Sequence, residues 1–256
     1  MTLSQSMTTQ PALFAAFDRI RIVNLPSRTD RRVEMERELR RVGLASDPRV
    51  SFFSAISCTD RGSFLRIGSH GAFLSHLALL TEAAEADETI LILQDDCDFL
   101  LPEIAEYRLP QHWDIFYGGY TASDPENLPE SDIIGAHFMG FSRRAAHIAA
   151  DYLSRYLMPD FPADVRATAQ PGFDPAIRPP IDGAFVWMRR AYPELATTFA
   201  LLGVQRPSRT DIGHRSWFDR TPGLRNIAEL LRQLRRRGKG HSAMKPANIR
   251  FGKGAR

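Results

Sequence analysis

The chain has 256 residues, of which 43% are hydrophobic and 25% are charged. This length and balance suit one α/β domain with a full hydrophobic core. No apolar stretch approaches the roughly 20 residues that a membrane-spanning helix needs, and the first residues lack the basic start and apolar segment of a secretory signal. The two cysteines, Cys58 and Cys97, are too few for a disulfide framework. We therefore expect a cytoplasmic protein with reduced thiols.

The charge is unevenly distributed along the chain. Residues 232–256 hold nine of the 33 Lys and Arg residues and no acid, which leaves 24 basic against 30 acidic residues elsewhere. Two interpretations of this basic tail stay open: peripheral docking on the anionic inner membrane, or a solvated terminus. A nucleic-acid-binding module is disfavoured, because the rest of the chain is acidic and carries no recognisable nucleic-acid motif.

The first half of the chain alternates strand and helix patterns. Residues 20–25 (IRIVNL) predict a buried strand. A helix should follow, capped by Asp30 and ended by a left-handed residue at Gly43. Residues 50–55 predict a second strand, and the Ala- and Leu-rich residues 69–86 predict a long, buried helix.

The second half continues this alternation after a central strand at 89–93 (TILIL), which ends abruptly in acidic residues. The further expected elements are strands at 113–117, 137–142 and 197–204, helices at 143–157, 182–191 and 225–237, and a Pro-rich loop at 159–180.

Such alternation predicts a Rossmann-type α/β domain with a mainly parallel sheet and helices on both faces. The expected organisation is a flexible N-terminus at 1–18, this domain at 19–222, and a basic C-terminal helix and tail at 223–256. In such sheets ligands bind outside the carboxyl ends of the strands. We expect Asn24, the acids at 94–98 and Gly118–Gly119 at that edge.

The acidic cluster after the central strand is the most informative feature of the sequence. Asp96-Cys97-Asp98 has the form D-x-D. Hard carboxylate oxygens suit Mg²⁺ or Mn²⁺, and such an ion takes few protein ligands and completes its shell with waters and substrate phosphates. A diphosphate is therefore the natural partner. The alternative is that these acids cap a helix or lie in solvent, since so short a motif often arises by chance.

Five blocks in this order resemble glycosyltransferase family 25, the LPS (lipooligosaccharide) biosynthesis glycosyltransferases. They are IVNLPSRTDRR at 22–32, GSHGAFLSHLALL at 68–80, LILQDDCDF at 91–99, GAHFMGFSRRAA at 135–146 and PIDGAF at 180–185. The resemblance covers roughly residues 19–222. It implies a GT-A-like fold, a nucleotide-sugar donor such as UDP-galactose, and inverting transfer of a hexose to a glycan or lipid-linked oligosaccharide.

The resemblance also implies site residues. Asn24, Leu25 and Arg31 match a first-strand segment that faces the nucleotide. Gly71, Ser75 and His76 match a block beside the donor, although a histidine on so apolar a helix is more often a core residue. Asp95 and Asp96 match the acidic pair of an E-D-D motif, in which Gln94 replaces the Glu.

The metal ligands and the catalytic base are also implied by family-like segments. Asp98 is expected to replace the carboxylate that Gln94 lacks, so which two acids hold the Mn²⁺ or Mg²⁺ stays open. The metal-ligand candidates are Asp96, Asp98 and His214, the last in the family-like segment 205–219. Inversion needs a base for the acceptor hydroxyl, and Asp182 in the late P-x-D block is the candidate. Its alternative is an ordinary helix cap.

Two other functions stay open. Gln94 suggests a catalytically inactive, glycosyltransferase-like binding protein. A Mg²⁺-dependent phosphohydrolase also places D-x-D after an apolar strand, but its motif lies near the N-terminus and continues with Thr or Val. Here Phe99 follows in mid-chain, which disfavours that class.

Overall fold

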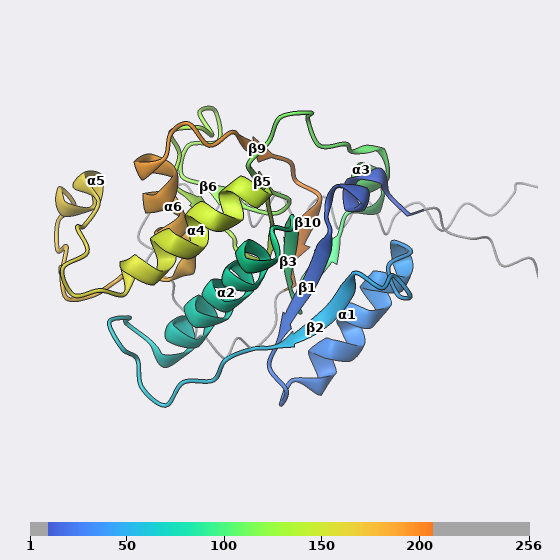
Figure 1. Cartoon of the computed structure of the whole chain (residues 1–256), viewed down its shortest axis with the longest axis horizontal. Helices are drawn as coiled ribbons and strands as arrows, with labels where there is room; N and C mark the ends of the chain where they lie inside the picture. Colours follow the sequence, from blue (N-terminus) through green and yellow to red (C-terminus); the bar gives the residue numbers. More distant parts are fainter. Residues whose placement is uncertain (1–9, 207–256) are drawn as a thin grey trace, which may run out of the picture. The chain divides into compact units, whose positions relative to one another are not determined.

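A six-stranded sheet organises residues 10–206, the part of the chain that this computed structural model describes (Figure 1). Its strand order is β2-β1-β3-β8-β5-β9. The strands are β1 (Arg19–Asn24), β2 (Val50–Ser54), β3 (Ile90–Gln94), β5 (Ile115–Tyr117), β8 (Phe138–Phe141) and β9 (Thr197–Phe199). Only β8 runs antiparallel to its neighbours in this sheet. The prediction of a mainly parallel sheet is confirmed.

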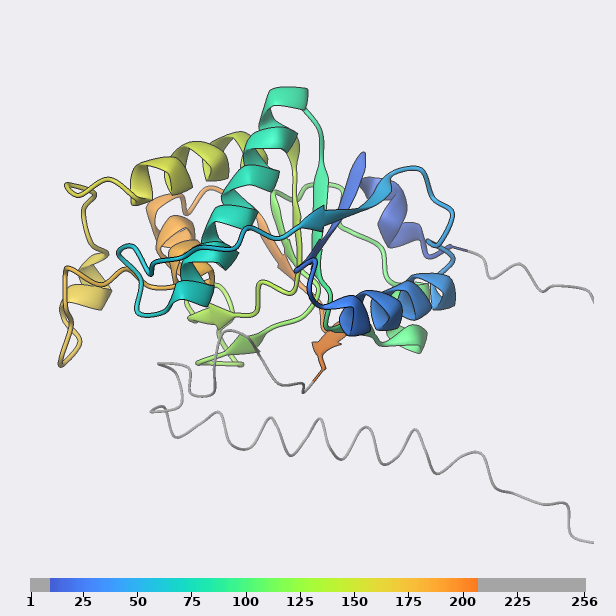
Figure 2. The ribbon, with the colours of Figure 1, turned by 90° about the horizontal axis from the view of Figure 1, so that it is seen from below.

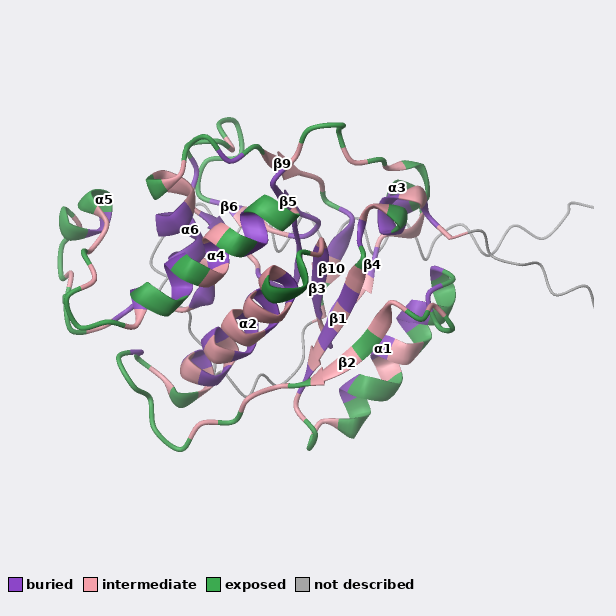
Figure 3. Cartoon of the chain, in the orientation of Figure 1, coloured by how far each residue is buried: buried purple, intermediate pink, exposed green. Residues whose placement is uncertain are grey.

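Helices cover both faces of the sheet (Figures 1 and 2). On one face lie α2 (Ile67–Ala86), α4 (Arg143–Tyr156) and α6 (Ile181–Ala191), and on the other lie α1 (Thr29–Arg41) and the short α3 (Leu101–Glu106). The central strand β3 has apolar side chains on both faces, so both faces need to be covered. Ile90 and Ile92 of β3 pack in the first core, which lies under α2, α4 and α6, whereas Leu91 and Leu93 pack in the second core, which lies under α1 and α3. A strand buried on both faces is a continuous apolar run in the sequence. Figure 3 shows β3 as a buried strand, and only its last residue, Gln94, is partly exposed.

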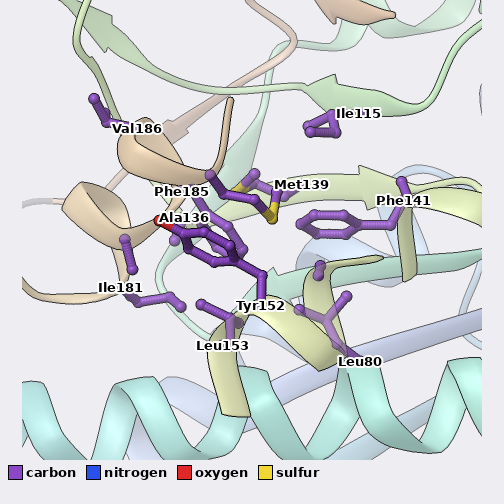
Figure 4. Close-up of a cluster of buried hydrophobic side chains, with 14 of the residues drawn as sticks. Leu80, Ile115, Ala136, Met139, Phe141, Tyr152, Leu153, Ile181, Phe185 and Val186 are labelled. Carbon is purple, nitrogen blue, oxygen red and sulfur yellow. The ribbon is translucent and has the colours of Figure 1, made fainter. Parts of the chain in front are cut away.

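The larger core fixes α6, and with it Asp182, against the sheet. Figure 4 shows side chains of α4 and α6 meeting those of the sheet. The rings of Phe141 and Phe185 lie 5.4 Å apart, and the ring of Trp187 lies 5.5 Å from that of Tyr156. Burying a side chain of this size contributes about 1.5–3 kcal/mol, so α6 is a rigid support for the residues in its first turn.

Residues 10–18 differ from the predicted flexible N-terminus. They contain a 3-10 helix, η1 (Ala12–Ala16), whose Leu13 and Phe14 are fully buried in the second core. Arg49 also donates hydrogen bonds to the carbonyl oxygens of Phe14 and Phe17 at 2.9 and 3.0 Å. Apolar burial and these bonds order the segment, so the prediction is wrong for residues 10–18.

Several predicted boundaries also change. Asp30 lies inside the first turn of α1 and pairs with Arg28 instead of capping the helix, whereas Gly43 has the expected positive φ of 71°. The strand predicted at 197–204 is two strands, β9 and β10 (Gly203–Gln205). The two strands belong to different sheets, and between them the backbone N–H groups of Leu202 and Gly203 both donate to the carbonyl oxygen of Gly118.

Strand β10 pairs antiparallel with β4 (Cys97–Phe99), which the sequence did not predict. The other unpredicted elements are β6 (Thr121–Ala122), β7 (Ile133–Ile134) and α5 (Val165–Thr168). No helix within residues 10–206 is both long enough and apolar enough to cross a membrane. His214, the helix predicted at 225–237 and the domain limit at 222 lie outside the described residues, so they stay predictions.

Candidate functional site

One edge of the sheet gathers the polar residues that the sequence singles out. Val23 of β1 pairs with Gln94 of β3, so the carboxyl ends of both strands meet there. Because β8 runs the opposite way, its amino end lies at the same edge, and the backbone N–H of Gln94 donates to the carbonyl of His137 at 2.9 Å. The N–H of Gly118 donates to Phe138 at 2.8 Å. The predicted convergence of Asn24, the acids and Gly118 is therefore confirmed.

Asp95 and Asp96 follow β3 directly and are only 5% and 2% exposed. Asn24 Nδ2 donates to Asp95 Oδ2 at 2.7 Å. Arg31 Nη1 lies 3.1 Å from Asp95 Oδ1 and 3.3 Å from Asp96 Oδ2, so one guanidinium serves two carboxylates. The second oxygen of Asp96, Oδ1, is buried without a hydrogen-bond partner among residues 10–206.

The pKa values of Asp95 and Asp96 are both raised. Burial raises the pKa of Asp95, and the charge of Asp96 raises it further, against the lowering effects of Asn24 and Arg31. Burial also raises the pKa of Asp96, and Arg31 is the largest opposing influence. Charged partners would normally hold a carboxyl pKa below its usual range. Here burial outweighs them, which leaves the pair able to bind a further cation.

Leu25 and Arg31 also lie where the sequence predicts. Leu25 follows β1 and is partly exposed, and its carbonyl accepts a hydrogen bond from the N–H of Arg28 at 2.8 Å. Arg31 extends from the first turn of α1 toward the acids. Arg31 thus contacts the acidic pair, and a contact of Leu25 or Arg31 with a nucleotide stays a prediction.

Asp98 lies on β4, and its main partner is a residue that the sequence did not single out. Arg206 donates from Nε and Nη2 to Asp98 Oδ1 at 2.9 and 2.5 Å, and it also pairs with Glu34. Next to it, Gln205 Nε2 donates to Asp96 Oδ2 at 3.3 Å. The one sequence signal for these two residues is that the family-like segment 205–219 begins there.

The contacts of the acidic residues decide whether a metal ion fits at this edge. Within residues 10–206, no group of three His, Cys, Asp or Glu side chains is arranged to hold a metal ion. Yet Asp96 Oδ1 lacks a partner, and four carboxylates (Asp95, Asp96, Asp98 and Glu34) share the guanidinium groups of Arg31 and Arg206. A hard divalent cation that takes few protein ligands fits this surplus of negative charge. Which acids would hold it stays open.

Asp182 lies in the first turn of α6 and does not cap that helix. Pro180 occupies the cap position, and no side chain accepts a capping hydrogen bond there. Asp182 Oδ1 instead accepts a hydrogen bond from the backbone N–H of Gly135 at 3.2 Å. Burial raises the pKa of this carboxyl, although Gly135 and the nearby His76 and His137 act to lower it. A carboxylate with a raised pKa is a stronger proton acceptor than a solvated one.

The residues predicted beside the donor on α2 are buried. Ser75 Oγ accepts from the N–H of Ile56 at 2.9 Å and donates to the carbonyl of Gly71 at 2.8 Å. A Cβ at Gly71 would lie 2.4 Å from the carbonyl oxygen of Ile56. These contacts hold the segment after β2 against α2. We assign Gly71 and Ser75 to packing, and a direct donor contact stays a prediction.

His76 is fully buried, and both of its ring nitrogens face backbone carbonyls. Nδ1 lies 2.9 Å from the oxygen of Ala72, and Nε2 lies 3.4 Å from that of Ala136. Burial lowers its pKa, so we assign a neutral ring with the proton on Nδ1, the nearer nitrogen. The nearby ionisable group is Asp182. A contact between His76 and the donor stays a prediction.

His137 is a site residue that sequence reasoning missed. It precedes β8, and burial lowers its pKa against the charge of Asp182 and the carbonyl of Gly203. A Cβ at Gly119 would lie only 2.3 Å from its Nε2, so Gly119 leaves the space that the ring occupies. The sequence holds His137 in the block at 135–146, but a lone histidine before a strand gives no further signal.

Comparisons with known proteins leave the family unassigned. No family model matches the chain, and no curated protein matches it. A solved structure that aligns with it is the crystal structure of a glycosyltransferase involved in the glycosylation of the major capsid of PBCV-1. The alignment covers 75% of this chain and 95% of that chain, with 12% sequence identity and a TM-score of 0.45. Values this low leave the activity to be inferred from the chain's own residues.

Proposed function

We propose that this protein is a GT-A-like glycosyltransferase that transfers a hexose from a UDP-sugar to a glycan or lipid-linked acceptor. The observation that carries the proposal is the buried pair of Asp95 and Asp96 at the carboxyl end of β3, where Asp96 Oδ1 has no hydrogen-bond partner within residues 10–206. Ligands of α/β sheets bind at this edge. A metal-bound diphosphate would supply the positive charge that the pair lacks and anionic oxygens for the nearby guanidinium groups.

The five blocks that resemble glycosyltransferase family 25 support the proposal by their positions. Blocks 22–32 and 91–99 supply Asn24, Arg31 and the acidic pair, which contact one another. The blocks at 135–146 and 180–185 meet at the hydrogen bond between Gly135 and Asp182. The block at 68–80 contributes the buried His76, which is near enough to Asp182 to influence the pKa of that carboxyl. Residues from separate blocks of the sequence therefore lie close together in the fold.

Mn²⁺ or Mg²⁺, when bound, would stabilise the negative charge that develops on the leaving diphosphate. Asp96 is the proposed first ligand, because its Oδ1 is unpartnered. Asn24 and Arg31 hold Asp95 behind it, and Arg31 keeps the two like charges close together. These residues fix the carboxylates before the donor arrives, which lowers the cost of ordering them on binding.

Asp182 is the proposed base. Inverting transfer requires the acceptor hydroxyl to lose its proton as it attacks the sugar, and a positioned carboxylate contributes typically 10²- to 10⁴-fold. The raised pKa of Asp182 makes it a stronger base than a solvated carboxylate. Its hydrogen bond from the backbone N–H of Gly135 fixes one oxygen. Peripheral docking of residues 232–256 on an anionic membrane would bring a lipid-linked acceptor close.

The test is release of nucleoside diphosphate from a panel of nucleotide sugars, with and without Mn²⁺. The variants are Asp96→Asn and, as a matched control, Asp151→Asn, an exposed acid on α4 that pairs with Arg155. We expect metal-dependent release from one donor, retained in the control and lost in Asp96→Asn. Metal-independent release, or equal rates in both variants, would contradict the proposed site.

The same assay separates the inactive alternative. Gln94 and the ion pairs that already engage Asp98 favour a glycosyltransferase-like binding protein. That protein would bind UDP in calorimetry but cleave no donor with any acceptor tested. Release of phosphate from phosphomonoesters would instead support the phosphohydrolase.

A further inference from the structure

Arg206 is the cation on the outer side of the acidic cluster, defined as Asp95, Asp96, Asp98 and Glu34. Its guanidinium donates to Asp98 and pairs with Glu34. Its backbone N–H donates to the carbonyl of Asp96 at 2.7 Å. The backbone of Arg206 is therefore tied to the residue that carries the unpartnered oxygen, while its side chain neutralises two neighbouring acids.

We propose that Arg206 is an exchangeable counter-ion, which leaves the acidic cluster when a divalent cation binds and then holds the diphosphate of the nucleotide. This rests on the proposed function and assigns a phosphate-binding residue to it. In the donor-free protein, Arg206 pairs with Asp98 and Glu34. A divalent cation held by Asp96 and Asp98 competes with Arg206 for Asp98, and the released guanidinium presents forked N–H donors that match phosphate oxygens.

The two arginines of the cluster differ in how easily they can exchange. The Arg31 side chain is 11% exposed, and its carboxylate partners are 7% and 3% exposed, so breaking these pairs would leave buried charges. The Arg206 side chain is 17% exposed, but its partners Asp98 and Glu34 are 20% and 44% exposed. Ion pairs at the solvent boundary are weak. Arg206 can therefore leave its partners at low cost, whereas Arg31 stays in place.

Asp96 supplies the independent sign that this cluster takes a ligand. Its Oδ1 is buried and has no hydrogen-bond partner in the described part of the chain, although Arg31 and Gln205 contact the other oxygen. A cation bound there would lie next to the residue whose carbonyl holds the Arg206 backbone. That anchor keeps the guanidinium within reach of anything the cation carries.

Two calorimetric titrations test the exchange. The first adds MnCl₂ alone to the metal-free protein, and the second adds UDP at saturating Mn²⁺. For Arg206→Gln we expect opposite changes: tighter binding of Mn²⁺ alone, because a competing cation is gone, and UDP binding weaker by about tenfold or more, because a charge-assisted hydrogen bond is lost. The matched control is Arg166→Gln, which removes an exposed arginine paired with Glu130 on the surface and should change neither affinity.

Each other outcome is decisive. If Arg206→Gln binds both ligands like the control, Arg206 is an ordinary surface ion pair and the proposal is wrong. If it binds both more weakly, Arg206 holds the acids in place and no exchange occurs. If the wild type binds neither Mn²⁺ nor UDP, the proposed function itself fails.

Glu34→Gln is a second test of the exchange, to be used if Arg206→Gln does not fold. This variant keeps Arg206 but removes one of its two carboxylate partners. It should bind UDP with Mn²⁺ at least as tightly as the wild type. A loss of tenfold would overturn the exchange, because it would mean that the Glu34 pair is needed to bind the nucleotide.

Discussion

Replacing Asp96 with Asn should stabilise the ligand-free protein, although it removes a central residue of the candidate site. Asp96 is almost fully buried, its Oδ1 lacks a partner, and burial raises its pKa. A raised pKa in the folded state means that the fold prefers the protonated acid, so at neutral pH the ionised carboxyl destabilises it. Asn has nearly the same shape, carries no charge, and can still accept the hydrogen bond from Gln205.

The expected gain follows from what the substitution removes and what it leaves. An unsatisfied buried polar group costs about 1–3 kcal/mol, and a charged one costs more. Part of this cost persists, because the Asn amide can place N–H donors where Oδ1 has no hydrogen-bond partner within residues 10–206, and the ion pair between Arg31 and Asp96 is lost. We expect a net gain of about 1 kcal/mol in the free energy of unfolding, or about 2–4 °C in Tm for a domain of this size.

The pH dependence of this gain has a defined sign. Above the folded-state pKa of Asp96, the wild type carries the destabilising charge and the variant does not, so the full gain is present. As the pH falls through that pKa the gain shrinks. It disappears below the ordinary Asp value of 3.8, where Asp96 is protonated in both the folded and the unfolded states.

Thermal unfolding in EDTA, followed from about pH 8 to about pH 4, measures this gain. Asp151→Asn, an exposed acid, is the control and should change stability by less than about 0.5 kcal/mol. Most substitutions destabilise, so a higher Tm for Asp96→Asn would be diagnostic. A lower Tm at neutral pH, or a gain that grows on acidification, would refute the reasoning and show that Arg31 overcompensates the charge.

Three further substitutions test the remaining assignments. Asp182→Asn should lower kcat for glycosyl transfer by about 10²- to 10⁴-fold and leave UDP affinity in calorimetry unchanged; a loss below tenfold would exclude it as the base. Gly71→Ala should lower the urea midpoint, because a Cβ would lie 2.4 Å from the Ile56 carbonyl oxygen. This overlap costs about 1–3 kcal/mol, which exceeds the roughly 1 kcal/mol that Ala gains over Gly in helix propensity. A raised midpoint would mean that the backbone at Ile56 shifts to make room. Ser75→Ala should cost about 1–3 kcal/mol, since it leaves the N–H of Ile56 without its acceptor, and an unchanged midpoint would show that water replaces the hydroxyl.

Local sequence patterns predicted most of the elements and the position of the acids. Asp95 and Asp96 directly follow the apolar run of β3. The strand and the acids are adjacent in the sequence, so a short local pattern is enough to predict both. The strand is buried on both faces, so its side chains must be apolar throughout. Gly43 likewise marks the end of α1, since only a residue tolerant of positive φ fits there.

The partners of these residues could not be predicted from the sequence. Arg206 reaches Asp98 across 108 residues, and Gln205 reaches Asp96 across 109. Such contacts depend on which short strands pair, and β4 and β10 have only three residues each, too few for a recognisable period. For the same reason the strand predicted at 197–204 did not reveal the change of sheet at Gly203.

The sequence by itself therefore determined the alternation of elements, the mainly parallel sheet and the edge at which the acids lie, because burial imposes a local period on each strand and helix. Only the tertiary structure decided that Ser75 bonds the backbone of Ile56, that residues 10–18 join the core, and that Arg206 pairs with two acids of the cluster. Those outcomes depend on which distant backbone and side-chain groups satisfy one another, and no local pattern in the chain encodes that pairing.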